Sequence, residues 1–155
     1  MSDIIYLDHA ATTPVRAEVL AAMLPYFSEH YGNPSSLHRL GRETGKALRT
    51  AREQVADVLG CLPGEIVFTS SGTEADNLAL RGVSLARRQR GQGSHIVVSA
   101  VEHKGILDTA THLRDFYGFE LTVLPVNAAG RVSPSDLAAA IRSDTVLVSI
   151  MAANN

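Results

Sequence analysis

The chain of 155 residues is poor in aromatic residues and in cysteine. It contains no tryptophan, four tyrosines, four phenylalanines and a single cysteine, Cys61. One cysteine excludes an internal disulfide and a metal site built from several thiolates. Cys61 lies in a Gly-Cys-Leu-Pro-Gly turn with nothing nearby arranged to activate a thiolate, which favours a structural role. The six histidines show no metal-binding spacing, so we expect no metal.

Long hydrophobic runs and a strong net charge are also missing. No apolar segment approaches the ~20 residues that a membrane span needs. The first residues lack the basic and apolar regions of a signal peptide. A net charge of −2 gives no basic surface for nucleic acid. We therefore expect a cytoplasmic globular protein that binds neither membrane nor nucleic acid.

What the sequence does contain is a regular alternation of helical and strand patterns. The apolar spacing predicts helices over 14–29, 38–59, 73–90, 104–117 and 134–142, and strands over 65–69, 95–99, 120–124 and 145–150. Val55 and Val58 are expected on the inward face of the second helix. The strand cores 96–98 and 146–148 are apolar without alternation, which is typical of parallel strands covered on both faces. The predicted fold class is α/β, a mainly parallel sheet with flanking helices.

The segment from Phe68 to Asn77 predicts an anion site. A strand-like run breaks into small hydroxylated residues and then a helical pattern. The first turn of a helix has unpaired N–H groups, and Gly72 would let the backbone approach a ligand closely. Neither a P-loop nor a G-x-G-x-x-G fingerprint is present, which disfavours a nucleotide. The alternative is a plain helix start capped by Ser or Thr.

Two other predicted strand ends carry polar side chains. Ligands of open α/β sheets bind beyond the carboxyl ends of the strands. His103 follows one such end, where an imidazole can stack on a planar ligand or move a proton. Asn154 and Asn155 follow another. Helix capping for His103 and an ordinary turn for the two asparagines are the alternatives.

Five ordered motifs resemble those of the cysteine desulfurases, pyridoxal-phosphate enzymes related to the class V aminotransferases. They are Tyr6-Leu7-Asp8-His9-Ala10-Ala11-Thr12-Thr13-Pro14, Gly32-Asn33-Pro34-Ser35-Ser36, residues 66–77, Glu102-His103-Lys104 and residues 148–155. The resemblance implies part of the large domain of the aspartate-aminotransferase-like fold. It places residues 1–14 in an N-terminal arm on the small-domain side and residues 15–155 in an incomplete cofactor-binding large domain.

The resemblance also implies roles for individual residues. Gly72 and Thr73 would hold the cofactor phosphate. His103 would stack on the pyridine ring and act in catalysis by assisting proton transfer. Asn155 would reach both the cofactor ring and the bound amino acid. Ala10 and Ala11 would line the substrate side of the pocket.

The activity implied for the parent protein is release of sulfur from L-cysteine. The products would be L-alanine and an enzyme-bound persulfide that supplies iron–sulfur cluster assembly or thiolation. The resemblance further implies pyridoxal 5'-phosphate as cofactor, a homodimer, and a sulfur-acceptor or iron–sulfur scaffold protein as partner. A selenocysteine lyase or an aminotransferase of the same fold is the alternative enzyme.

This sequence departs from the family in lacking the cofactor lysine and the catalytic cysteine. The cofactor needs a lysine for covalent attachment, and the only two lysines are Lys46, within a predicted helix, and Lys104, in the Glu-His-Lys motif. Neither matches the family's cofactor lysine, and Cys61 lies outside the motif of the catalytic cysteine. We therefore expect a fragment that is inactive alone. The alternative function, from a different class, is a non-enzymatic interaction module or half of a split enzyme.

Overall fold

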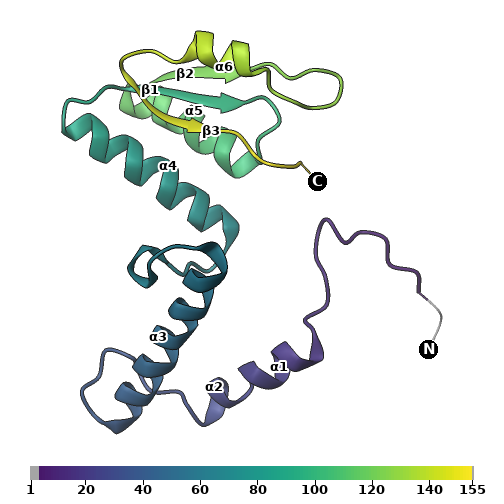
Figure 1. Ribbon diagram of the computed structural model, residues 1–155, viewed down its shortest axis with the longest axis vertical. Helices are drawn as coiled ribbons and strands as arrows, with labels where there is room; N and C mark the ends of the chain where they lie inside the picture. The colour runs from purple at the N-terminus through teal and green to yellow at the C-terminus, as the bar shows by residue number, and fades with distance from the viewer. Residues whose placement is uncertain (1–3, 155) are drawn as a thin grey trace. The chain divides into compact units, whose positions relative to one another are not determined.

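The computed structural model describes residues 4–154 and divides the chain into two compact units, Met1–Phe68 and Thr69–Asn155 (Figure 1). Asn155 of the predicted site lies outside the described residues. The predicted division into an arm of residues 1–14 and a larger domain stays a prediction.

The first unit begins with two short helices, α1 (Ala17–Met23) and α2 (Pro25–Ser28). The single predicted helix over 14–29 is therefore wrong, both at its start and at its middle. Pro25 has no backbone N–H, so it cannot donate to the carbonyl one turn earlier, and a new helix starts there with proline at its first position. Pro14 precedes the first helix instead of opening it.

The predicted second helix is confirmed as α3 (Arg39–Leu59), which ends at Gly60 in the left-handed conformation. The His38 side chain caps its start by accepting from the N–H of Gly41 at 3.4 Å. The preceding loop packs closely there, since a β-carbon on Gly41 would lie 2.2 Å from the Ser36 carbonyl oxygen. The inward placement of Val55 and Val58 is wrong, because these side chains are 36% and 85% exposed and the helix instead buries Gly41, Thr44, Gly45 and Ala56.

The strand predicted over 65–69 is also wrong. A 3₁₀ turn, η1 (Pro63–Glu65), occupies its start, and Ile66 continues with extended backbone angles. Extended backbone becomes a strand only where a neighbour accepts and donates its backbone hydrogen bonds, and no such neighbour exists within the described part of the chain.

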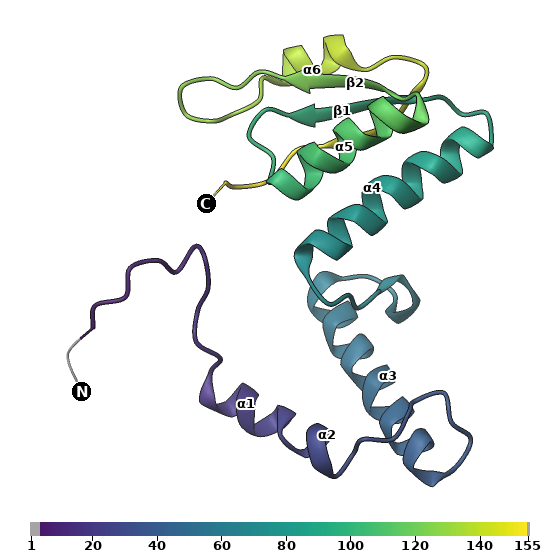
Figure 2. The same cartoon turned by 180° about the vertical axis from the view of Figure 1, so that it is seen from behind.

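The second unit is a three-stranded parallel sheet in the order β2-β1-β3. It consists of α4 (Gly72–Gln89), β1 (His95–Ser99), α5 (Lys104–Tyr117), β2 (Glu120–Leu124), α6 (Pro134–Ala140) and β3 (Thr145–Ser149). These elements confirm the predicted α/β class and its parallel sheet. Figures 1 and 2 show α6 on one face of the sheet and α5 on the other.

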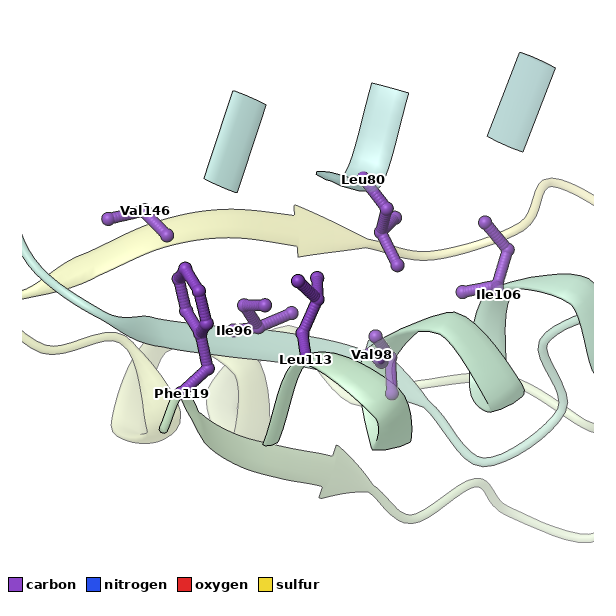
Figure 3. Close-up of a cluster of buried hydrophobic side chains, with 8 residues drawn as sticks. Leu80, Ile96, Val98, Ile106, Leu113, Phe119 and Val146 are labelled. Atoms are coloured by element: carbon purple, nitrogen blue, oxygen red, sulfur yellow. The ribbon is translucent and has the colours of Figure 1, made fainter. Parts of the chain in front are cut away.

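The core of this unit lies between the sheet and the helices α4 and α5 (Figure 3). Its buried side chains are Leu80, Ile96, Val98, Ile106, Ala110, Leu113, Phe119 and Val146. Burying one such Leu, Ile, Val or Phe side chain stabilises the fold by roughly 1.5–3 kcal/mol. The packing fixes both helices on the same face of β1 and so brings their first turns to the carboxyl edge of the sheet.

A buried histidine joins the three strands near their amino ends. His95 is 1% exposed, and its ring contacts two hydroxyl groups, Nδ1 with Thr145 Oγ1 and Nε2 with Thr122 Oγ1, each at 2.8 Å. Burial lowers the pKa of His95, with a smaller contribution from the positive charge of Arg142. The neutral ring therefore acts as a bridge across β2, β1 and β3.

Candidate functional site

The first turn of α4 presents two free backbone donors. Ser71 caps this helix, and its hydroxyl oxygen accepts from the N–H of Glu74 at 3.2 Å. The N–H groups of Gly72 and Thr73 have no hydrogen-bond partner among residues 4–154. Nothing lies within 4 Å of the position of a β-carbon on Gly72. This helix start therefore has two N–H groups without a partner at the positive end of the helix dipole, and the predicted anion site stays a prediction.

Glu74 takes up one of the hydroxyl donors expected at this turn. Its Oε2 accepts from the N–H of Ser70 at 2.6 Å and from the Ser70 hydroxyl at 2.5 Å. These two hydrogen bonds lower the pKa of Glu74, so the carboxylate stays ionised. Ser70 is therefore a partner of Glu74, and the donors left are the N–H groups of Gly72 and Thr73 and the hydroxyl hydrogens of Ser71 and Thr73.

His103 caps the start of α5. Its Nδ1 accepts from the N–H of Gly105 at 3.0 Å, so the neutral ring carries its proton on Nε2. The side chain is exposed, and Nε2 has no partner within the described residues. The capping role weighed from the sequence is therefore present, and it leaves the other ring nitrogen and the ring faces available to a ligand.

The starts of α4 and α5 lie next to each other. A β-carbon on Gly105 would lie 3.5 Å from Thr73 Cγ2 and 3.2 Å from His103 Nδ1. Asn77 joins the two helices, because its amide donates to the Thr73 carbonyl at 2.9 Å and its Oδ1 accepts from the Thr109 hydroxyl at 2.8 Å. The structure thus brings Thr73 and His103 together, with the positive ends of two helices beside them.

A buried carboxylate connects two strand ends at the same edge. Glu102 is 7% exposed, and its Oε1 accepts from the Ser99 hydroxyl at 3.0 Å and from the N–H of Met151 at 2.6 Å. Asn154 donates from its side-chain amide to the Val101 carbonyl at 2.7 Å. The sequence predicts Asn154 at this edge, whereas Glu102 was quoted there only within the Glu-His-Lys motif and was given no role of its own. Its partner Met151 lies 49 residues away in the sequence, so no local spacing signalled this role.

Ala10 and Ala11 lie in the first unit, in a turn whose backbone closes from the N–H of Ala11 to the Asp8 carbonyl at 3.1 Å. The Tyr6 hydroxyl donates to the carbonyls of Asp8 at 2.8 Å and Thr12 at 3.0 Å across the same turn. Both alanines are exposed. Their role toward a substrate stays a prediction.

Two kinds of site receive no support from the described residues. No group of three or more His, Cys, Asp or Glu side chains among residues 4–154 is arranged to hold a metal ion. No helix in the same range combines the length and the hydropathy needed to span a membrane.

Comparison with known proteins finds a family model and relatives that agree with one another. The family model described as aminotransferase class-V matches residues 5–155. The cysteine desulfurase IscS of Methanosarcina thermophila is 50% identical over 151 residues, which is 97% of this chain and 37% of that protein. The putative cysteine desulfurase IscS 1 of Bacillus subtilis is 48% identical over 151 residues, covering 39% of its length. The chain thus spans well under half the length of these curated relatives.

Solved structures show the same fold. A NifS-like protein superposes with a TM-score of 0.87 at 42% identity, over 93% of this chain and 39% of that chain. A structure described as SspA in complex with cysteine gives a TM-score of 0.89 at 39% identity, over 96% and 42% of the two chains.

Proposed function

The chain belongs to the class-V aminotransferase family, and from this premise we propose that it forms the phosphate-binding and ring-stacking part of a pyridoxal-phosphate-dependent cysteine desulfurase. The proposed reaction of the whole protein converts L-cysteine to L-alanine and leaves the sulfur as an enzyme-bound persulfide. The observation that carries the proposal is the pair of unpartnered N–H groups at the start of α4 beside the exposed imidazole of His103.

The residues at this edge fit the chemistry of the cofactor. The N–H groups of Gly72 and Thr73, with the Thr73 hydroxyl, would hold the phosphate, since two helix starts supply positive potential there. The exposed face of His103 would stack on the pyridine ring. Pyridoxal phosphate, when bound, supplies a carbonyl carbon for attachment of the amino acid and a ring that accepts electrons.

His103 is the proposed acid–base group of this chain. Because Gly105 donates to Nδ1, the neutral ring carries its hydrogen on Nε2 and can donate a hydrogen bond to a ligand from there. The neutral ring has no second lone pair, so His103 would take up a proton at Nδ1 after releasing the capping hydrogen bond, and the resulting imidazolium could give a proton back from Nε2.

Asn155, Ala10 and Ala11 complete the proposed site. Asn155 follows Asn154 in the sequence, and the side-chain amide of Asn154 donates to the Val101 carbonyl at 2.7 Å. We assign it to the cofactor ring and the amino acid, and we assign Ala10 and Ala11 to the substrate side. We further propose a cytoplasmic homodimer that passes sulfur to an acceptor or iron–sulfur scaffold protein.

The proposal is tested with the full-length protein. We expect bound pyridoxal phosphate with its visible absorption, and equal amounts of alanine and transferable sulfur from L-cysteine. His103→Gln should keep the cofactor and slow turnover by roughly 10²–10⁴-fold, the usual effect of losing a general acid–base group. Lys104→Ala, at the next position, which is also exposed, is the control. Normal turnover in His103→Gln would remove His103 from the reaction.

A selenocysteine lyase of the same fold would share these residues. Comparing kcat/KM for L-cysteine and L-selenocysteine in the same preparation separates the two enzymes. A full-length protein that binds no pyridoxal phosphate and acts on neither amino acid would favour an interaction module instead.

A further inference from the structure

We propose that Glu102 is a positioning residue that locks the segment after β3 to the turn between β1 and α5. That turn carries His103, and the segment carries Asn154 and leads to Asn155. The inference rests on the proposed function, because it concerns how these residues keep their places around a cofactor.

The hydrogen bonds of Glu102 cross from one strand end to another. One carboxylate oxygen accepts from the hydroxyl of Ser99, the last residue of β1, and from the backbone N–H of Met151, just beyond β3. The contact with Met151 is short, at 2.6 Å, and Ser99 is fully buried. Hydrogen bonds to an ionised acceptor are about twice as strong as neutral ones.

A second hydrogen bond closes the connection at its other end. The side-chain amide of Asn154 donates to the carbonyl of Val101, the neighbour of Glu102, at 2.7 Å. The segment 151–154 is thus fixed to the turn at both of its ends. The parallel ladder between β1 and β3 has its last aligned pair at Val98 and Ser149, so beyond that point these side chains replace the ladder.

The arrangement explains why a carboxylate is buried at this position. A buried carboxylate is costly unless it is hydrogen-bonded, and Glu102 finds both a hydroxyl and a backbone donor. Removing it would leave the Met151 N–H and the Ser99 hydroxyl without an acceptor. The segment 151–154 would then separate from the turn without any change in the core side chains that Figure 3 shows.

The experiment compares Glu102→Leu with Glu102→Gln in the full-length protein. Gln keeps an oxygen that accepts from both donors, whereas Leu removes the acceptor at similar size. The first measurement is amide hydrogen exchange of Met151 without cofactor, with the Val97 amide in β1 as the internal reference. We expect exchange at Met151 to be about tenfold faster or more in the Leu variant, with Val97 unchanged, and close to wild type in the Gln variant.

The second measurement is the affinity for pyridoxal phosphate. We expect about tenfold weaker binding in Glu102→Leu, recovery in Glu102→Gln, and no change in the control Asp108→Asn, whose carboxylate is exposed on α5. Unchanged exchange at Met151 in the Leu variant would overturn the proposed lock, whatever the cofactor does. Faster exchange with unchanged affinity would overturn its positioning role. Wild-type protein that binds no cofactor would instead overturn the proposed function.

If Glu102→Leu does not fold, Ser99→Ala and Asn154→Ala test the same connection one hydrogen bond at a time. We expect Asn154→Ala to speed exchange within residues 151–154 and Ser99→Ala to loosen Glu102. Wild-type exchange and affinity in both variants would contradict the proposal.

Discussion

Gly72 and His103, two residues of the proposed site, each have an atom without a hydrogen-bond partner among residues 4–154. The N–H of Gly72 is free because it is at the first position of α4, where no carbonyl precedes it in the helix. His103 caps α5 through Nδ1, and its Nε2 has no partner within the described part of the chain. The proposed anion binding would come from the geometry of helix starts, and changes that remove a donor without disturbing the helix should test it.

Gly72→Pro is such a change. Proline suits the first helical position, and Ser71 before it has the extended backbone angles that a following proline requires. The helix should persist while one N–H donor is lost. We expect affinity for pyridoxal phosphate to fall by about 1.5–3 kcal/mol in the full-length protein, measured by cofactor titration. Gly72→Ala retains the N–H and meets no atom within 4 Å, so it is the matched control. Equal affinity in the two variants would exclude this N–H as a phosphate donor.

Because the pKa of His95 is lowered in the folded state, we expect the free energy of unfolding to depend on pH. Its pKa is lowered in the folded state, chiefly by burial, whereas an unfolded histidine titrates near ~6.5. Below that pH the unfolded chain binds a proton that the folded chain does not, so stability falls as the pH decreases, by at most about 1.4 kcal/mol per pH unit. Hydrogen exchange of the β1 amides between about pH 5 and 7.5, corrected for intrinsic rates, measures this.

His95→Gln should flatten that dependence, while His30→Gln, at an exposed position, should keep it. A profile as steep in His95→Gln as in wild type would show that other groups are responsible.

The sequence could not predict the role of His95, because its partners Thr122 and Thr145 are 27 and 50 residues away and meet only once the parallel register is formed. Glu102 was missed for the same reason, since Met151 is 49 residues away.

At the scale of elements, the sequence predicted correctly the helices and strands whose boundaries depend on neighbouring residues. The helices α3 and α5 and the strands β1 and β2 agree with the sequence to within a residue, because each combines an apolar face with a cap or a turn. Two predicted elements were wrong, the single helix over 14–29 and the strand over 65–69, because a proline or a missing partner strand outweighed the local apolar pattern. Pro25 interrupts an otherwise continuous apolar pattern, and residues 66–69 have strand composition without a pairing strand.

At Gly93 the backbone packs directly against the backbone of Asp144, and the start of β3 depends on this contact. Its φ is +127°, and a β-carbon there would lie 2.2 Å from the Asp144 carbonyl oxygen, at the point where β1 and β3 begin. Gly93→Ala must shift the start of β3 away from His95. We expect destabilisation of the sheet well above the roughly 1 kcal/mol typical of an alanine in a left-handed position.

Gly91→Ala is the matched control for that substitution. Gly91 has a φ of +70° with no atom within 4 Å of a β-carbon, so only the backbone cost applies. Denaturant midpoints of the two variants, each compared with wild type, measure the difference. Equal losses would show that the contact with Asp144 is relaxed without cost.

At the scale of the whole chain, we expect apolar surface and the free edges of β2 and β3 in the described part of the sheet to determine how the chain behaves in isolation. β3 pairs only with β1 among the described residues, and Val148 and Ile150 at this edge are 40% and 41% exposed. In the first unit Leu37 and Phe27 are 90% and 73% exposed. An unpaired apolar strand is a template for pairing with another chain. The predicted covering of 145–150 on both faces is thus only partly present, with Val146 buried and Val148 exposed.

We therefore expect the isolated 155-residue chain to self-associate in a concentration-dependent way. Sedimentation velocity measures this, and Val148→Lys should reduce association because a lysine on an edge strand opposes pairing. Val83→Lys is the matched control, since Val83 is similarly exposed, at 42%, but lies on α4. Equal reduction by both variants would implicate general apolar surface instead of the edge. A monodisperse wild-type monomer with a sharp thermal transition would contradict the prediction, because it would mean that the free hydrogen-bonding groups of β3 are satisfied by water at no cost to folding.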